Sequence, residues 1–166
     1  MTTKRPSVVV TGANRGIGLE LVSQYLANDW QVHGCCRRPE LATQLAGLVS
    51  NSALSIHQLD VSNPDSVKQL ALALSEQSID LLINNAGIYG GERQSFGDIN
   101  YAQWTQVLEV NTLGPYRVST ALADQVGNSE QRMMVNISSA MGSIERYTSR
   151  SEEHKSELQS LGNLVS

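Results

Sequence analysis

A glycine-rich turn near the N-terminus connects a run of β-branched apolar residues to a stretch whose apolar residues recur at helical spacing. The run is Val8, Val9 and Val10, the turn covers residues 11–18, and the helical pattern begins at Ile17. A helix that starts at such a turn directs its free N–H groups and the positive end of its dipole toward the turn. Because glycine has no Cβ, the backbone there can approach a pyrophosphate closely. The unit is therefore expected to hold a dinucleotide at the first strand-to-helix connection.

The spacing of the glycines is informative but does not decide the matter alone. Gly12, Gly16 and Gly18 stand at G-x-x-x-G-x-G rather than at the more usual G-x-G-x-x-G. No Gly-Lys-Ser/Thr follows, so the turn is not a P-loop for nucleoside triphosphates. The same pattern also fits a glycine-rich loop that binds no ligand, and features further along the chain have to separate the two.

The composition of the chain limits its partners and its compartment. The 166 residues show no shift in composition that would mark two domains, and the formal net charge is -4. Nucleic-acid binding normally needs a basic face, so we expect no nucleic-acid partner. No apolar run approaches the roughly 20 residues that cross a bilayer, and the N-terminal run is too short for a signal peptide. We therefore expect a cytoplasmic protein of one domain with no membrane partner.

Strand-like and helix-like segments alternate along the chain. Strands are predicted at residues 7–10, 31–36, 54–59, 81–83 and 133–138, and helices at 16–28, from Pro39 through Leu48, from Pro64 through Leu74, and from Tyr101 onward. This alternation implies a parallel sheet with helices on both faces, a doubly wound α/β fold. Ligands bind such sheets beyond the carboxyl ends of the strands, where residues 12–18, Asp60, 84–87 and 138–139 fall. Pro115 is expected to bend the last helix or to be absorbed by it.

Two adjacent cysteines, Cys35 and Cys36, lie in the second predicted strand. Neighbours on a strand point to opposite faces of the sheet, so we expect two reduced, apolar side chains rather than a disulfide. The histidines at 33, 57 and 154 do not combine with them at a metal-ligand spacing. No metal is expected.

Five motifs follow one another in an order that resembles the short-chain dehydrogenase/reductase family. They are Thr-Gly-x-x-x-Gly-x-Gly at 11–18, Leu-Asp-Val at 59–61, Asn-Asn-Ala-Gly at 84–87, Val-Asn at 110–111 and Asn-Ile-Ser-Ser at 136–139. The resemblance extends from Val8 to about residue 149. Residues 35–37, 88–90 and 141–144 make the chain most similar to the C-factor-type members. The family implies a Rossmann-type doubly wound parallel sheet, a nicotinamide cofactor, and hydride transfer between a small carbonyl or alcohol substrate and that cofactor.

The resemblance also implies a role for individual residues. Cofactor binding is carried over to Gly12, Asn14, Arg15, Gly16, Ile17 and Gly18 at the pyrophosphate turn, to Arg37, to Asp60 and Val61 at the adenine, and to Asn84, Ala86 and Gly87 beside the central strands. Asn111 corresponds to an asparagine that organises a proton-relay water, and Ser139 to the catalytic serine that hydrogen-bonds the reacting oxygen. Asp60 also fits a capping or loop aspartate, and Asn111 a satisfied polar residue.

The choice between the two cofactor forms depends on charge. Enzymes that use NAD favour an acid after the second strand, where it binds the ribose 2′-OH. This chain has Arg37 and Arg38 there, and Arg15 in the first turn. Guanidinium groups match phosphate oxygens, so NADP(H) is favoured over NAD(H). A solvated basic pair without a ligand is the alternative.

The chain departs from the family after Ser139, where a Tyr-x-x-x-Lys pair should supply the proton donor. Tyr147 and Lys155 are eight residues apart, and no tyrosine of the chain has a lysine four positions later. The stretch that starts at about Arg150 resembles a translated sequencing adapter. We therefore expect an incomplete, C-terminally truncated Rossmann domain over 1–149, without the family's last helices and strands, and a non-native tail over 150–166. The alternative is a genuine charged C-terminal helix.

Two classes of function remain open. A family member of this kind is an NADPH-dependent oxidoreductase, and this chain is expected to be inactive because it lacks the tyrosine. A dinucleotide-binding or sensor domain without catalysis is the other class. In the family, the helix that carries Asn111 pairs with a later helix at a dimer face, so an intact relative is expected to be a homo-oligomer. That expectation does not extend to this chain.

Overall fold

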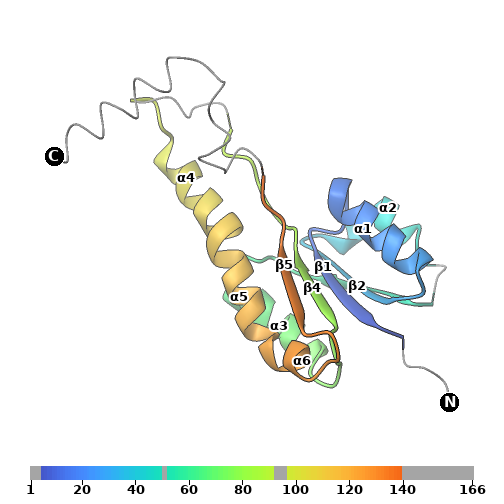
Figure 1. Ribbon diagram of the computed structural model, residues 1–166. Coiled ribbons are helices and arrows are strands. Elements are labelled where there is room, and N and C mark those ends of the chain that lie inside the picture. The colour runs from blue at the N-terminus through green and yellow to red at the C-terminus, as the bar shows by residue number, and fades with distance from the viewer. Residues whose placement is uncertain (1–4, 50–51, 92–96, 140–166) are drawn as a thin grey trace.

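The computed structural model describes residues 5–49, 52–91 and 97–139, and its centre is a five-stranded parallel sheet (Figure 1). The strand order is β3-β2-β1-β4-β5. The strands are β1 (Ser7–Thr11), β2 (Gln31–Cys36), β3 (Leu54–Gln58), β4 (Leu81–Asn84) and β5 (Met133–Asn136). The chain moves outward from β1 to β3 and then returns to β4, so the order reverses between β1 and β4. The predicted doubly wound fold is confirmed, and the strand ends shift by one or two residues.

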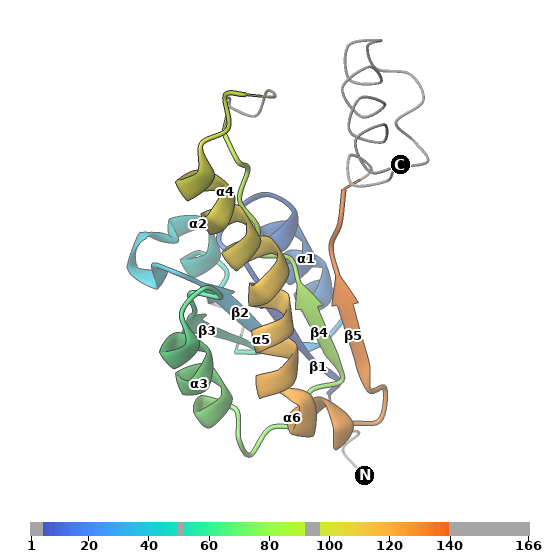
Figure 2. The same ribbon diagram turned by 90° about the vertical axis from the view of Figure 1, so that its left-hand side faces the viewer.

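Helices cover both faces of the sheet (Figures 1 and 2). One face carries α1 (Gly16–Ala27) and α2 (Thr43–Ala46), and the other carries α3 (Pro64–Ala73), α5 (Gly114–Ala121) and α6 (Ala123–Gly127). A further helix, α4 (Tyr101–Leu108), precedes α5 and extends past the carboxyl edge of the sheet. In the described part of the chain, no helix is both long enough and apolar enough to cross a membrane.

The core consists of two apolar clusters, one on each side of the sheet. The valines of β1 alternate between them: Val9 lies in the α3 cluster, and Val8 and Val10 lie in the α1 cluster. Cys35 and Cys36 divide in the same way, and both thiols are free and buried, as the alternation predicts. Burial raises the pKa of both thiols, so they pack as neutral apolar groups.

The continuous helix predicted from Pro39 through Leu48 is wrong. A 3-10 turn, η1 (Pro39–Leu41), and the short helix α2 replace it, and the backbone of Ala42 departs from helical geometry between them. Leu45 is fully buried, whereas Leu41 is 61% exposed. The apolar periodicity suggested one buried face, but only part of that face finds a core to pack against.

The predicted long helix after Tyr101 contains one turn of π-helix, η2 (Glu109–Leu113), between α4 and α5. Pro115 lies directly after this turn, at the start of α5, where a missing N–H group is tolerated. Arg117 and Glu109 form an ion pair of 2.6 Å across the turn. The proline is thus absorbed by widening the helix. The positions Tyr147 and Lys155 and the adapter-like tail from Arg150 lie outside the described residues.

Candidate functional site

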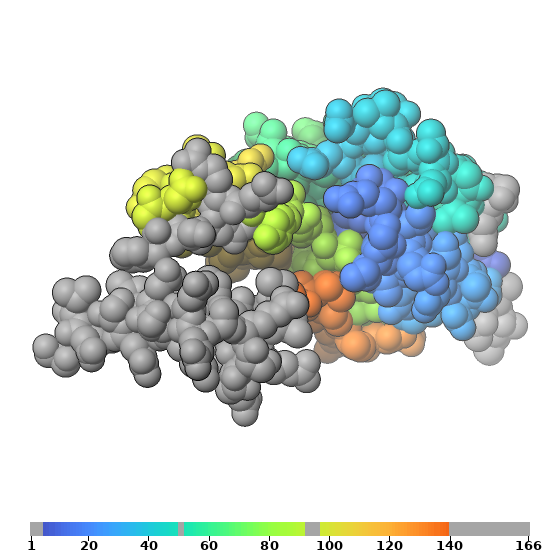
Figure 3. Space-filling model, turned by 90° about the horizontal axis from the view of Figure 1, so that it is seen from above, coloured from blue at the N-terminus to red at the C-terminus, as the bar shows by residue number. Residues whose placement is uncertain are grey.

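A cavity of about 320 Å³ lies at the carboxyl ends of the strands, beside the switch point between β1 and β4. Seen from above, the glycine-rich turn at residues 11–18 lies next to the segment that follows β4 (Figure 3). The cavity brings together Gly12, Asn14, Arg15, Gly16, Ile17, Gly18, Arg37, Asp60, Val61, Ala86 and Gly87, all of which were predicted cofactor residues. It is also lined by Cys36, Arg38, Leu41, Leu59, Asn85, Ile88 and Val110.

Two glycines of the turn are required by close backbone contacts. Gly12 has φ +68, and a Cβ on it would lie 2.8 Å from the Cα of Ala86. A Cβ on Gly18 would overlap the carbonyl oxygen of Gly12 and approach Asn85 Nδ2. The space that a larger residue would fill at these positions lets the turn lie against the segment after β4. The third glycine, Gly16, has φ +56 and no neighbour within 4 Å.

Thr11 and Asn85 hold the turn against the segment that follows β4. Thr11 Oγ1 accepts hydrogen bonds from the backbone N–H groups of Asn85 and Ala86, at 3.0 and 2.9 Å. Asn85 Nδ2 donates to the carbonyl oxygens of Thr11 and Gly12, at 2.9 and 3.2 Å. Both residues belong to predicted motifs, but the motifs do not assign them to the cofactor site. Their contacts join residues more than seventy positions apart, which no local pattern reveals.

Within the described residues, the first turn of α1 has backbone N–H groups that no side chain caps. Arg15 occupies the N-cap position with extended backbone and makes no capping hydrogen bond, and the first turn contains no acidic residue. Free N–H groups at a helix N-terminus, together with the helix dipole, attract an anion. The lining of the cavity by Gly16, Ile17 and Gly18 places this end of the helix at the site.

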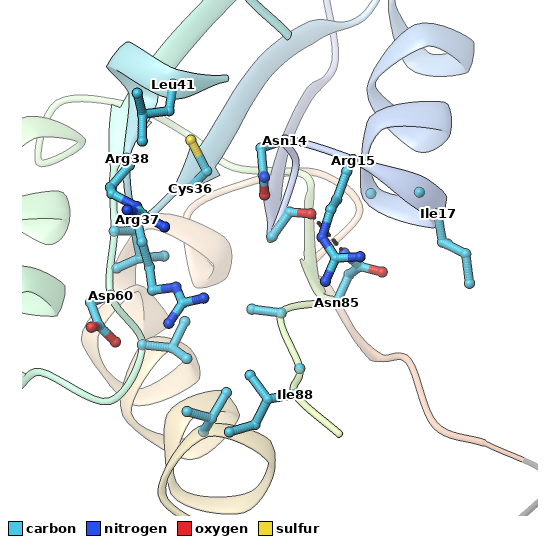
Figure 4. A pocket seen from close by; sticks show the side chains of 18 residues that line it. Asn14, Arg15, Ile17, Cys36, Arg37, Arg38, Leu41, Asp60, Asn85 and Ile88 are labelled. Atoms are coloured by element: carbon cyan, nitrogen blue, oxygen red, sulfur yellow. Dashed lines mark hydrogen bonds between the residues drawn. The ribbon is translucent and has the colours of Figure 1, made fainter. Parts of the chain in front are cut away.

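Arginine side chains reach the cavity from two sides (Figure 4). Arg37 and Arg38 follow β2, and Arg15 comes from the first turn. Within the described ranges, none of the three is part of an ion pair with an acidic residue. An anionic ligand would therefore meet guanidinium groups whose charge is not already neutralised by a salt bridge.

Asp60 and Val61 follow β3 and line the cavity, with Asp60 on the same side as Arg37 and across from Arg15 (Figure 4). The carboxylate oxygen Oδ1 of Asp60 accepts hydrogen bonds from the N–H and the hydroxyl of Ser62, at 2.9 and 2.6 Å. This arrangement is an Asx turn that precedes α3. It keeps Asp60 at the cavity wall.

Asn84 is the one predicted cofactor residue that does not line the cavity. Its side chain is buried and donates to Ser119 Oγ and to Asn136 Oδ1, both at 3.0 Å. These contacts join β4 to α5 and to β5. Its position suits a structural tie between the layers.

Neither of the two predicted catalytic residues lines the 320 Å³ cavity. Asn111 sits in the π-helical turn, where its Oδ1 accepts from the N–H of Ile88 and its Nδ2 donates to the carbonyl of Ile88, both at 2.9 Å. It lines a second cavity of about 410 Å³, together with Tyr89 and Trp104. Ser139 follows β5 at the same edge of the sheet and lines neither cavity.

Comparisons with known proteins agree with this architecture. The crystal structure of an NADPH-bound carbonyl reductase from chicken fatty liver superposes with a TM-score of 0.77 at 34% identity, covering 86% of this chain and 60% of that chain. A carbonyl reductase from Pseudomonas aeruginosa PAO1 gives a TM-score of 0.79 at 32% identity, covering 87% and 66%. The (+)-neomenthol dehydrogenase of Arabidopsis thaliana is 30% identical, and the match covers 82% of this chain and 54% of that protein.

The strand order, the switch point and the uncapped turn define a Rossmann-type α/β domain. The sequence profile of the short chain dehydrogenase family matches residues 6–150, and the chain belongs to that family of oxidoreductases. The chain spans about half the length of the curated relatives that it matches.

Proposed function

We propose that the cavity at the carboxyl ends of the strands binds NADP(H) and that the chain derives from an oxidoreductase that interconverts a carbonyl and an alcohol. The observation that carries the proposal is the uncapped N-terminus of α1, which opens on the cavity. The glycines at 12 and 18 let the turn pack closely against Asn85 and Ala86, and this packing holds the first turn of α1 at the cavity. The pyrophosphate would lie on residues 12–18, where the free N–H groups meet it.

The arginines favour the phosphorylated form of the cofactor. Arg37 and Arg38 occupy the position after β2 at which NAD enzymes favour an acid. Their guanidinium groups would hold a 2′-phosphate, and Arg15 would add positive charge on the pyrophosphate side. Two of the structural neighbours, the chicken liver carbonyl reductase and a Burkholderia multivorans protein, contain NADPH or NADP. A solvated basic pair would make no such distinction between cofactors.

The remaining residues suit the other parts of the cofactor. Asp60 and Val61 would contact the adenine, and Ala86 and Gly87 would lie along the ribose and the nicotinamide. When bound, the nicotinamide supplies or accepts a hydride. Asn84 would stabilise the site indirectly, because its hydrogen bonds join β4 to α5 and β5.

The catalytic part of the proposal divides between two residues. Both side-chain groups of Asn111 are engaged by Ile88, so Asn111 would act by fixing the segment that follows β4. Ser139 would donate a hydrogen bond to the reacting oxygen. Because the sequence lacks Tyr-x-x-x-Lys, the chain should turn over about 10²–10⁴-fold more slowly than a relative that has it. The boundary near residue 149 and the cytoplasmic location stay predictions.

Calorimetry with NADPH and NADH tests the cofactor assignment. The unmodified chain should bind NADPH at least about tenfold more tightly than NADH, and the double variant Arg37→Ala/Arg38→Ala should remove the difference. Arg5→Ala is the matched control, because Arg5 pairs with Asp29 and does not line the cavity. Equal affinities in the unmodified chain would contradict the NADP assignment. Binding of neither form would overturn the site.

A second candidate function is binding without catalysis, as in a dinucleotide sensor. Some dinucleotide-binding folds bind without catalysis, and the cavity by itself fits binding alone. NADPH oxidation over a panel of carbonyl compounds, measured beside a relative that has the pair, separates the two. Turnover equal to that of the relative would exclude a sensor, whereas binding without turnover in both proteins would support one.

A further inference from the structure

The backbone and side chain of Asp60 are fixed by three residues that follow it. Its N–H donates to Ser66 Oγ at 2.9 Å, and its carbonyl oxygen accepts from the N–H of Asn63 at 3.1 Å. Its carboxylate oxygen Oδ1 accepts from the N–H and the hydroxyl of Ser62. The Ser62 hydroxyl contact, at 2.6 Å, has the length of a hydrogen bond strengthened by a charged acceptor.

The two carboxylate oxygens of Asp60 are therefore not equivalent. Oδ1 receives two donors from Ser62, whereas Oδ2 has no hydrogen-bond partner in the part of the chain that the structure describes. Asp60 is only partly buried, and it lies at the wall of the 320 Å³ cavity, on the same side as Arg37 (Figure 4). An ionised carboxylate can only accept hydrogen bonds. The remaining oxygen is thus an oriented acceptor that a ligand with an N–H donor can satisfy.

We propose that Ser62 is a positioning residue that sets the base selectivity of the cofactor site. By holding Oδ1, it orients Asp60 so that Oδ2 accepts a hydrogen bond from the exocyclic amino group of adenine. A hypoxanthine base has a carbonyl oxygen at that position, and this oxygen would face the carboxylate without a proton between them. The site then prefers an amino-purine dinucleotide. This inference rests on the proposed function, since it assigns the adenine to the Asp60 wall of the cavity.

A merely structural role for Ser62 would have a different signature. Ser62 lies at the entrance to α3, and losing its hydroxyl could simply loosen the turn. Such loosening would lower the stability of the chain or lower the affinity for every dinucleotide to the same extent. Only a residue that acts through the Asp60 carboxylate should change the ratio of affinities for two bases.

The test is calorimetry on the full chain with NADPH and with its hypoxanthine analogue. The unmodified chain should prefer NADPH by about tenfold. Ser62→Ala should lower the affinity for NADPH by about 5- to 10-fold and leave the affinity for the analogue nearly unchanged. The ratio of the two affinities should therefore fall to about one. Ser62→Thr keeps the hydroxyl and should restore the ratio. Asp60→Asn replaces one acceptor by a donor and should shift the preference toward hypoxanthine.

Ser66→Ala is the matched control, because Ser66 accepts from the backbone of Asp60 and does not contact its carboxylate. It should change the melting temperature without changing the ratio. An unchanged ratio in Ser62→Ala, with NADPH still bound by the unmodified chain, overturns the assignment of Ser62 and leaves the proposed function intact. If the unmodified chain binds no NADPH, the proposed function itself fails.

Discussion

Two helices begin at the carboxyl edge of the sheet, and their first turns are built in opposite ways. α3 begins after Asn63, whose side chain accepts from the N–H groups of Asp65 and Ser66 at 2.9 and 3.2 Å. Its first turn also has a proline and an acid. α1 begins after Arg15, without a capping side chain and without an acid. The protein satisfies donors of α3 with its own side chain, whereas the N-cap residue of α1 makes no capping hydrogen bond.

The same contrast extends across the cavity. The α1 side presents backbone donors with Arg15, whereas the α3 side presents the carboxylate of Asp60. A dinucleotide has phosphates at its centre and an amino-bearing base at one end, so each wall suits a different part of it. A helix start at a strand end is therefore not enough to define a phosphate site. The absence of an internal cap is the feature that distinguishes α1.

The largest expected effect comes from breaking the close packing between the first turn of α1 and the residues that hold it, Gly12 and Asn85. In Gly18→Ala the new methyl group would overlap the Gly12 carbonyl oxygen and crowd Asn85. We expect a loss of about 3 kcal/mol in the free energy of unfolding and no detectable NADPH binding. Chemical denaturation and calorimetry measure both quantities.

Gly127→Ala is the control for this substitution. Gly127 ends α6 and has no atom within 4 Å of a Cβ placed on it. It should keep the stability and the affinity. If Gly18→Ala does the same, close packing at Gly18 is not what holds the first turn of α1 at the cavity.

Local sequence patterns predicted the open turn well and its surroundings less well. The β1–turn–α1 unit depends on residues that are adjacent in the chain, so glycine spacing and apolar runs were sufficient. Asn84 is different, because the partners of its side chain, Ser119 and Asn136, lie 35 and 52 positions away. The motif predicts a place beside a cofactor, and the folded sheet adds the side-chain partners that tie β4 to α5 and β5.

The prediction for Leu41 failed for a related reason. Its spacing to Leu45 fits one helical face, but the spacing does not tell which apolar residues meet a core. Leu41 remains exposed next to the cavity, and the expected helix breaks at Ala42. The hydrogen bonds of Ser62 to Asp60 were also not foreseen, although the two residues are only two positions apart. Side-chain direction within a turn is not encoded in apolar periodicity.

A second, smaller effect is a pH dependence of stability that should come from only one face of the sheet. His33 on β2 and His57 on β3 share the α3 face with Cys35 and Leu59, and their nitrogens Nδ1 and Nε2 are 3.0 Å apart. His33 and His57 are the two histidines of the described residues, and both lie on this face of the sheet. Burial, followed by the nearby His57, lowers the pKa of His33 to about 4, and burial also lowers the pKa of His57.

Both imidazoles are neutral in the folded chain, whereas the unfolded chain binds protons below pH 6.5. The stability from this pair is therefore complete above that pH and is lost as the pH falls toward 4. His33 alone should remove about 2 kcal/mol between pH 7.5 and pH 5. Urea denaturation at the two pH values measures the loss. His33→Gln should flatten the profile, and an equal loss in that variant would assign the acid sensitivity elsewhere.

The smallest effect tests the contrast between α1 and α3 most directly, by removing the cap of α3 and adding a cap to α1. Asn63→Ala removes the cap of α3 and should cost about 1 kcal/mol of stability while NADPH binds as before. Arg15→Asp gives α1 a capping carboxylate at a position whose backbone is already extended, with φ -163. It should add a few tenths to about 1 kcal/mol of stability, because the free N–H groups gain an acceptor.

The nucleotide affinity should respond in the opposite sense to the stability. In Arg15→Asp the new carboxylate occupies the donors that the pyrophosphate needs, repels its charge and replaces the Arg15 guanidinium, so NADPH affinity should fall at least about tenfold. If Asn63→Ala weakens binding as much as Arg15→Asp does, the two helix starts are not functionally distinct. If Arg15→Asp stabilises the chain and binding is unchanged, the first turn of α1 is not where the phosphates lie. Only a gain in stability together with a loss of affinity shows that the protein left these donors uncapped for its ligand.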